Sequence, residues 1–192
     1  MIPNAVRALR AVLVLALLTG IAYPLAITGI AQLTMPDKAD GSLVRLDGEV
    51  VGSSSIGQLW EGEQWFHGRP SAVDYDASTS SGSNLGPNSQ ELSDQIAERA
   101  DAILELEGPY HPDLTVSGIP VDLLTTSASG LDPDISVAAA ELQAARIAQV
   151  RGLPLEQVRS LIEDHTQEPT LGFLGEERVN VLELNLALAQ AA

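Results

Sequence analysis

The chain has 192 residues, 45% of them hydrophobic, which is enough for one domain with a packed core and short for two. It contains no cysteine, which excludes a disulfide framework, a thiolate zinc site, a catalytic thiol and a lipidated cysteine. Arg7 and Arg10 are the only charged residues among the first 36, so the other 26 acidic and 8 basic side chains give the rest of the chain a net charge of −18. So acidic a region is expected to repel nucleic acid and anionic lipid head groups, and its charge favours solubility.

The N-terminal region contains an uncharged run of 23 residues from Ala11 to Leu33. A helix needs about 20 apolar residues to cross a bilayer, and basic residues tend to lie on the cytoplasmic side. We therefore expect a short cytoplasmic N-terminus at 1–10, a transmembrane helix at 11–33 and one extracytoplasmic domain at 34–192. A cleaved signal peptide is the alternative, but its apolar core usually spans only about 7–15 residues.

Small residues in this run favour packing against another helix. Thr19, Ala22, Ala26 and Gly29 follow at spacings that place them on one helical face, where a neighbouring backbone can approach closely. Pro24 lacks an N–H and leaves the carbonyl of Gly20 without its helical partner, which a neighbouring helix can compensate. The alternative is that small residues and proline are simply frequent in membrane helices. The predicted helix-packing residues are thus Thr19, Gly20, Ala22, Pro24, Ala26 and Gly29.

The remainder of the chain predicts an α+β domain with helices dominating its C-terminal half. Ser42–Leu46 and Glu49–Val51 flank Asp47-Gly48, which predicts a β-hairpin. Residues 68–89 are polar and lack apolar periodicity, as expected of a long loop that is functional or disordered. A second polar stretch covers residues 125–134. Between the two, the apolar run Ile119–Leu124 predicts a buried strand.

Four helices are predicted from capping residues and apolar spacing. Asn88 and Glu91 begin the first, which Gly108-Pro109 ends, with an apolar face of Leu92, Ile96, Ala100, Ile103 and Leu104. The second begins at the cap Ser136 and ends at Gly152, with these residues inward: Ala139, Leu142, the stem of Arg146, Ile147 and Val150. The third follows Pro154 and turns Val158, Leu161 and Ile162 inward. The C-terminal run alternates like a strand, but a capping box at Asn180 and Glu183 favours a helix.

Catalytic and ligand-binding motifs are missing or incomplete. Gly52–Gly57 has the spacing of half a phosphate loop, but Gln58 and Leu59 replace the lysine and the hydroxyl residue that would hold phosphate and magnesium. The histidines lack zinc-site spacing. Serines in 78–83 and 125–129 lack a base placed by sequence and are interpreted as turn formers, as are the aspartates flanking Pro133. The sequence therefore predicts no catalytic, cofactor-binding or metal-binding residue.

The two polar stretches hold the candidate interface residues. Arg69 is the only basic side chain between Arg45 and Arg99, so we expect carboxylate or carbonyl partners for its guanidinium. Asn84, Gly86 and Gly130 suit turn positions with positive φ. We expect both stretches to be ordered and to contribute to a partner-facing surface, although well-built turns are the alternative. The full candidate set is Arg69, Ser71, Asn84, Gly86, Ser129, Gly130 and Asp132.

Six segments in order carry a family resemblance: TGIAYPLAITGIAQ at 19–32, VGSSSIGQ at 51–58, FHGRPSAVDY at 66–75, SGSNLGPNS at 81–89, TTSASGLDPDIS at 125–136 and RVNVLELNLAL at 178–188. Together they resemble the KdpC subunit family of the bacterial potassium-transporting Kdp P-type ATPase, the KdpFABC complex. One departure is Asp134, which stands where the family usually has histidine, so no imidazole is present there.

The resemblance implies a non-catalytic accessory subunit in the cell membrane, beside the channel-like potassium-binding subunit KdpA, the P-type ATPase subunit KdpB and the small peptide KdpF. ATP and potassium would then be handled by the partner subunits, and no cofactor is expected here. Two roles are proposed for the family: raising the ATP affinity of the catalytic subunit as a catalytic chaperone, or covering the potassium entrance.

The expected orientation separates residues 37–192 from cytoplasmic ATP, and the acidic domain lacks a basic phosphate cradle. Assembly and entrance-capping are therefore favoured over ATP contact. Two alternatives from other classes are a membrane-anchored extracytoplasmic serine hydrolase using a serine of 125–129, and a secreted binding module whose N-terminus is removed.

Overall fold

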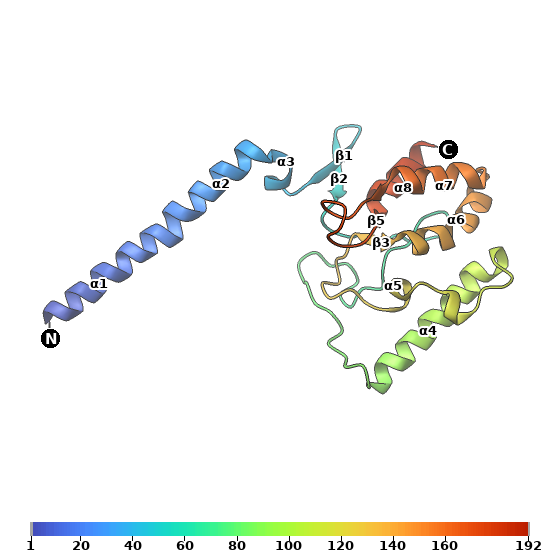
Figure 1. Ribbon diagram of the computed structural model, residues 1–192, viewed down its shortest axis with the longest axis horizontal. Helices are drawn as coiled ribbons and strands as arrows, with labels where there is room; N and C mark the ends of the chain where they lie inside the picture. Colours follow the sequence, from blue (N-terminus) through green and yellow to red (C-terminus); the bar gives the residue numbers. More distant parts are fainter. Residues whose placement is uncertain (1, 192) are drawn as a thin grey trace. The chain divides into compact units, whose positions relative to one another are not determined.

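The apolar N-terminal run forms one long helix in the computed structural model, which describes residues 2–191 (Figure 1). It consists of α1 (Ile2–Leu17), a π-helical turn (Leu18–Ala22) and α2 (Tyr23–Thr34). Pro3–Thr34 is long and apolar enough to cross a membrane by length and composition, with a mean hydropathy of 2.2 in its most apolar window. At 1.5 Å per residue it spans about 48 Å, more than the hydrocarbon thickness of a bilayer.

The wide turn at Leu18–Ala22 lies directly before Pro24. Here the Tyr23 N–H donates to the Leu18 carbonyl, five residues back instead of four. Proline cannot donate and crowds the preceding turn, and a π-turn is one way for a helix to absorb such a disturbance. Thr19 lies inside this turn, so its angular offset from Ala22 differs from that in a regular helix, whereas Ala26 and Gly29 follow in regular α-helix.

A predicted hairpin follows and is confirmed. After the short helix α3 (Pro36–Ala39), β1 (Leu43–Leu46) pairs antiparallel with β2 (Glu49–Ser53), with Leu46 opposite Glu49. The turn residues Asp47 and Gly48 both have positive φ, 52° and 86°, as a two-residue hairpin turn requires. The hairpin groups with the long helix in a first unit that ends at Ser53, and a second unit begins at Ser54.

The second unit combines helices with a small antiparallel sheet, which confirms the α+β class. The strands β3 (Asp134–Ser136), β4 (Thr166–Gln167) and β5 (Arg178–Asn180) lie in the order β3-β5-β4. Figure 1 shows α6, α7 and α8 beside this sheet and α4 along the lower edge of the same unit. The helices are α4 (Gln90–Glu107), α5 (Val121–Leu124), α6 (Val137–Arg151), α7 (Leu155–Asp164) and α8 (Val181–Gln190), with 3-10 turns at Gly108–Tyr110 and Val116–Gly118.

Most helix ends follow the predicted capping chemistry. The Ser136 hydroxyl accepts from the Ala139 N–H at 3.0 Å, and Gly152 ends α6 with φ of 68°. Asn180 caps α8 by accepting from the Glu183 N–H at 3.2 Å, so the helix expected for the C-terminal run is confirmed. The predicted cap Asn88 is wrong, because Ser89 takes that position and accepts from the Leu92 N–H.

The strand predicted at Ile119–Leu124 is also wrong. Val121–Leu124 is a single helical turn, entered from extended backbone at Pro120. Leu123 and Leu124 are buried as expected, while Val121 is 69% exposed. A short apolar run has the same composition whether it forms a buried strand or a buried helical turn, so periodicity cannot separate the two.

The core lies between α4, α6, α7, α8 and the sheet. Its buried members include Phe66, Ile135, Ala139, Ala140, Ala144, Ile147, Val158, Ile162, Val179, Leu184 and Leu188. The alanines on α6 allow neighbouring elements to approach this helix closely. Val150 is 41% exposed, so its predicted inward position is wrong. Arg146 was expected to bury only its stem, but the whole residue is buried, guanidinium included.

The buried Arg146 guanidinium joins three parts of the domain. Its Nε donates to Glu107 Oε1 of α4 at 2.8 Å, in an ion pair whose side chains are 0% and 2% exposed. Nη1 donates to the carbonyls of Glu63 and Trp65, and Nη2 donates to Gln143 Oε1 at 3.0 Å. The irregular segment 63–67 is therefore anchored by α6 and, through the ion pair, by the end of α4.

Two buried amides complete this anchorage. Asn185 of α8 accepts from the Phe66 N–H and donates to the Phe66 carbonyl, both at 2.9 Å. Gln143 of α6 does the same for His67, at 2.8 and 3.1 Å. Side-chain amides thus satisfy a buried backbone segment that lies in no sheet, as buried polar groups require.

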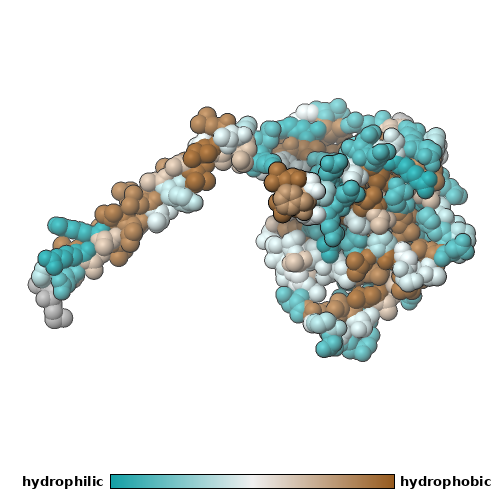
Figure 2. Space-filling model, in the orientation of Figure 1, coloured by the Kyte–Doolittle hydropathy of each residue, from teal (hydrophilic) through white to brown (hydrophobic). Residues whose placement is uncertain are grey.

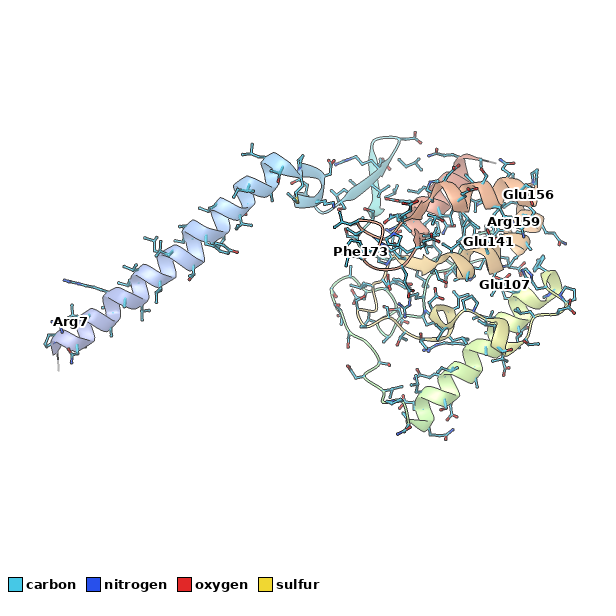
Figure 3. The ribbon with its side chains drawn as sticks, viewed as in Figure 1. Arg7, Glu107, Glu141, Glu156, Arg159 and Phe173 are labelled. Carbon is cyan, nitrogen blue, oxygen red and sulfur yellow. The ribbon has the colours of Figure 1, made fainter. Side chains whose placement is uncertain are left out.

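We predict that Arg146→Met destabilises the full chain by about 3–5 kcal/mol, because it leaves the Glu107 carboxylate buried without a counter-charge. Arg159→Met is the matched control: Arg159 pairs with Glu141 and Glu156 at the surface, with 48% of its side chain exposed (Figure 3). Urea unfolding of each variant in detergent measures the difference. A loss at Arg146 no greater than that at Arg159 would contradict the role assigned to the buried pair.

Candidate functional site

The two polar stretches predicted as loops lie against each other and are ordered. Residues 68–89 contain no helix or strand, and 125–133 contain none either. The Ser71 hydroxyl donates to the Gly130 carbonyl at 2.6 Å, and the Ser81 N–H donates to the Ser129 carbonyl at 2.9 Å. The predicted order of both stretches is confirmed, and their hydrogen bonds bring five of the seven candidate residues together.

Arg69 bridges the two loops and has the partners expected from its isolation in the sequence. Its Nη1 donates to Asp132 Oδ2 at 3.0 Å, and Nη2 is 3.5 Å from the Thr125 carbonyl. The two side chains of the ion pair are only 25% and 28% exposed. The other oxygen of Asp132 accepts from the Asp134 N–H at 3.1 Å, so Asp132 also forms the turn that its place before Pro133 predicts.

Ser71 and Tyr75 close the first loop on itself. The Ser71 hydroxyl accepts from the N–H groups of Val73 and Tyr75, both at 3.1 Å. The Tyr75 hydroxyl donates to the Arg69 carbonyl at 2.7 Å. Burial, and secondarily the nearby Asp132 carboxylate, raise the pKa of Tyr75 to about 12, so the phenol remains a donor at every physiological pH.

The turn geometry confirms two of three predicted positions. Gly130 has φ of 68°, and a Cβ there would lie 2.6 Å from Val73 Cγ2 and 2.7 Å from the Ser81 carbonyl oxygen. Asn84 has φ of 56°, and its side-chain amide donates to the Gly82 carbonyl. Gly86 does not have positive φ, so that prediction is wrong, and a Cβ there would meet nothing within 4 Å.

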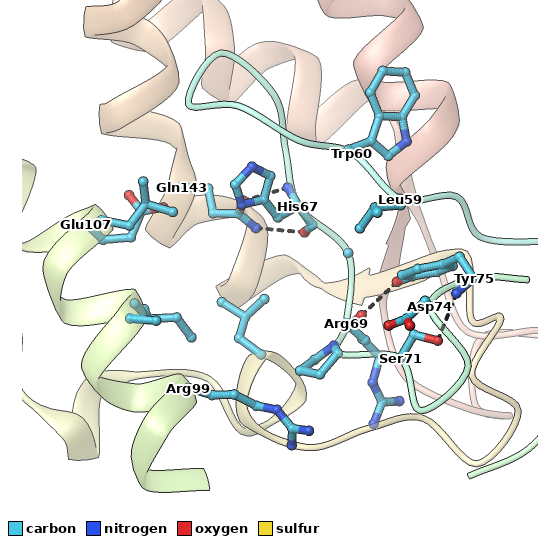
Figure 4. A pocket seen from close by; sticks show the side chains of 16 residues that line it. Leu59, Trp60, His67, Arg69, Ser71, Asp74, Tyr75, Arg99, Glu107 and Gln143 are labelled. Carbon is cyan, nitrogen blue, oxygen red and sulfur yellow. Dashed lines mark hydrogen bonds between the residues drawn. The ribbon is translucent and has the colours of Figure 1, made fainter. Parts of the chain in front are cut away.

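A cavity of about 310 Å³ opens beside Arg69, between the first polar loop and α4 (Figure 4). Its walls are largely apolar, with Leu59, Ile103 and Leu106 among them. Three residues that line it hold buried polar atoms without a hydrogen-bond partner in the described part of the chain: Trp60 Nε1, Arg69 Nε and Glu107 Oε2. Burial raises the pKa of Glu107, against the opposing effect of Arg146. The cavity is small and mostly apolar, with few polar groups.

The two serines of the second loop, Ser127 and Ser129, form turns through hydrogen bonds to backbone N–H groups. Ser127 Oγ accepts from the Gly130 N–H, and Ser129 Oγ accepts from the Leu131 N–H. His67 in the cavity wall contacts the Gly62 carbonyl through its ring, and burial, with a smaller contribution from Arg146, lowers its pKa. In these hydrogen bonds neither Ser127 nor Ser129 has a histidine partner of the kind that activates a nucleophile.

Asp134, at a position where the family resemblance predicts histidine, has its own partners. It forms an ion pair with Arg178 Nε at 2.9 Å, and its other oxygen accepts from Asn180 Nδ2 at 3.3 Å. Burial raises the pKa of Asp134, and Arg178 opposes that shift. Its side chain therefore joins the neighbouring strands β3 and β5, while its backbone N–H donates to Asp132 at the end of the second loop. Among the described residues, no group of three or more acidic or histidine side chains could hold a metal ion.

Glu107 and Gln143 are not among the residues predicted from the sequence, although a signal for both is present there. Glu107 lies four residues after Ile103 and three after Leu104, so it continues the apolar face of α4. Gln143 and Arg146 occupy inward positions of α6 in the same way. A polar residue at an apolar position of a helix indicates a buried group with a partner. Tyr75 and Trp60 lie in irregular segments, where no such periodicity exists.

The fold and site define an α+β domain that follows a helix long and apolar enough to span a membrane, with two polar loops that hydrogen-bond to each other. Residues 5–190 match the model of the family described as K+-transporting ATPase, c chain, and the chain belongs to this family.

The chain is also similar to several potassium-transporting ATPase KdpC subunits. That of Polaromonas naphthalenivorans is 57% identical over 178 residues, which cover 91% of this chain and 88% of the relative. That of Variovorax paradoxus is 53% identical, over 98% and 97% of the two chains. That of Bradyrhizobium diazoefficiens is 49% identical, over 94% and 93%. The similarity thus extends over the helix and the domain together.

Gly130→Ala is expected to destabilise the chain by about 1–3 kcal/mol, because it adds a side chain at positive φ and forces it against Val73 and Ser81. Gly86→Ala is the matched control, since the space around Gly86 is open. Thermal unfolding followed by circular dichroism compares the two. Equal melting temperatures for both variants would show that the contact between the loops is not tight.

Proposed function

We propose that this chain is a non-catalytic accessory subunit of an ATP-driven potassium import complex. It promotes assembly with KdpA, KdpB and KdpF and covers the potassium entrance of KdpA. Family membership supports the complex. The observation that carries the role is the pair of ordered polar loops joined by Arg69 and Asp132. Rigid loops lose little conformational entropy when a partner binds, so they suit a docking surface.

ATP and potassium are handled by the partner subunits in this proposal. Backbone N–H groups at a helix start or basic side chains usually hold phosphate, and the domain is strongly acidic. The serines that a hydrolase would need are engaged in turns. Raising the ATP affinity of KdpB, the catalytic-chaperone role, would then require an indirect effect through the complex.

The small-residue face of the long helix supports assembly inside the membrane. Ala26 and Gly29 lie in regular helix beyond the wide turn, where a partner helix can approach the backbone. The Thr19 hydroxyl donates to the Leu15 carbonyl at 2.8 Å, so it is satisfied within its own helix.

Ala26→Leu should reduce co-purification of the other subunits more than Leu15→Ala does, because the larger side chain holds a partner helix away from the small-residue face.

The domain is expected to lie outside the cytoplasm, because Arg7 and Arg10 precede the span. A protease added to cells with a permeabilised outer envelope should digest residues beyond Asp37 and leave cytoplasmic marker proteins intact. Protection of the domain until the inner membrane is broken would reverse the orientation and restore direct ATP contact as a possibility.

Arg69→Ala in the full chain is expected to lower co-purification of the partner subunits several-fold and to leave the melting temperature close to that of the wild type. The Arg69–Asp132 pair is partly exposed, so its contribution to folding should be modest. Arg159→Ala removes an arginine paired at another surface and is the control. If Arg69→Ala melts early but assembles normally once folded, Arg69 is a brace inside the domain and not part of the interface. Normal assembly with a normal melt would remove the loops from the proposed surface.

A further inference from the structure

A loop between β4 and β5 holds three large apolar side chains in solvent. Leu171, Phe173 and Leu174 are 79%, 72% and 51% exposed, and we call these three residues the apolar finger. Leu171 and Phe173 are the most exposed large hydrophobic residues of the second unit among those described. Figure 2 shows a hydrophobic cluster standing out from the domain where Figure 3 labels Phe173. Such a cluster is typical of an interaction site.

The finger is held in shape by its backbone. Thr170 and Leu174 exchange two N–H to carbonyl hydrogen bonds, at 2.9 and 3.0 Å, and the Gly172 N–H donates to the Pro169 carbonyl at 2.8 Å. Leu171 has φ of 59°, a conformation that is costly for a bulky residue. No burial inside this domain compensates for the backbone strain at Leu171 or for the exposure of the three apolar side chains. A preformed apolar projection is what a docking anchor requires, since little order remains to be imposed on binding.

The base of the finger is acidic. Gly175, Glu176 and Glu177 line a hollow of about 560 Å³ together with Asp122 and Asp132. Asp134 lines it as well, together with two arginines, Arg69 and Arg178, which pair with Asp132 and Asp134 and leave the hollow acidic overall. The finger therefore adjoins the surface proposed to face a partner, and the combination of an apolar centre with a charged rim resembles the anatomy of protein interfaces.

We propose that the apolar finger inserts into an apolar socket on another protein of the transport complex, and that lysine or arginine side chains around the socket face the acidic hollow. This inference rests on the proposed function. Anionic lipid is disfavoured as the occupant, because the carboxylates at the base repel a negative membrane surface. A second copy of this chain is disfavoured for the same reason, since it would bring a matching acidic rim.

The test uses the tagged full chain, co-expressed with the other subunits and purified in detergent. Phe173→Ser and Leu171→Ser are expected to lower the recovered partner protein at least tenfold, as truncation of a central anchor does. Val116→Ser is the matched control, because Val116 is 50% exposed in a 3-10 turn. All three variants should retain the wild-type melting temperature, since none of these side chains is buried.

A second set of variants tests the rim. Glu176→Gln with Glu177→Gln should weaken recovery and flatten its dependence on salt concentration, because fewer charges remain to be screened. Glu98→Gln, at an exposed position of α4, should leave both unchanged.

The outcomes separate the two proposals. If the wild-type chain recovers no partner subunit, the proposed function fails and the finger inference fails with it. If the wild type recovers its partners and both finger variants do so equally well, only the finger inference is overturned. It is also overturned if the finger variants differ from wild type only in binding to vesicles with anionic lipid, or only in forming a cross-linked homodimer.

Discussion

The buried guanidinium of Arg146 is the interaction on which the rest of the domain depends. It connects the end of α4, the middle of α6 and the irregular segment 63–67, using Glu107, Gln143 and two backbone carbonyls as acceptors. A buried charge is tolerated only when its donors are satisfied, so these elements must meet in one arrangement. The segment so anchored leads directly into the loop that holds Arg69. The position of the candidate surface therefore depends on a polar contact deep in the core.

The two polar loops are ordered without secondary structure, by side chains that bond to backbone. The Ser71 hydroxyl forms hydrogen bonds with three backbone groups. The side chains of Arg69 and Tyr75 each donate to one backbone carbonyl, and Arg69 also forms the ion pair with Asp132. Ordering a long loop carries an entropic cost. A domain that needed these residues only for connection could use fewer of them. Their hydrogen bonds, the adjoining acidic hollow and the apolar finger together describe a surface suited to a partner protein.

Asp134, at a position where the family resemblance predicts histidine, has two side-chain partners of its own. The carboxylate binds Arg178 and Asn180 of the adjacent strand and so reinforces the short pairing of β3 with β5. An imidazole could not form the same ion pair. These side-chain contacts lie within the sheet and are separate from the hydrogen bonds that join the two loops.

The sequence by itself determined the features that local chemistry controls. An uncharged apolar run forms the long helix, Asp-Gly forms the hairpin turn, and Ser136, Gly152 and Asn180 set helix ends. The order of six segments also indicated the family. Tertiary structure decided the features that depend on distant partners. These include Ser89 as the cap in place of Asn88, a helical turn in place of a strand at 121–124, ordinary φ at Gly86 and the complete burial of Arg146. It also decided that the loop at 170–175 projects three apolar side chains into solvent. Burial and exposure depend on which residues pack together although they lie far apart in the chain. A local sequence pattern does not specify that packing.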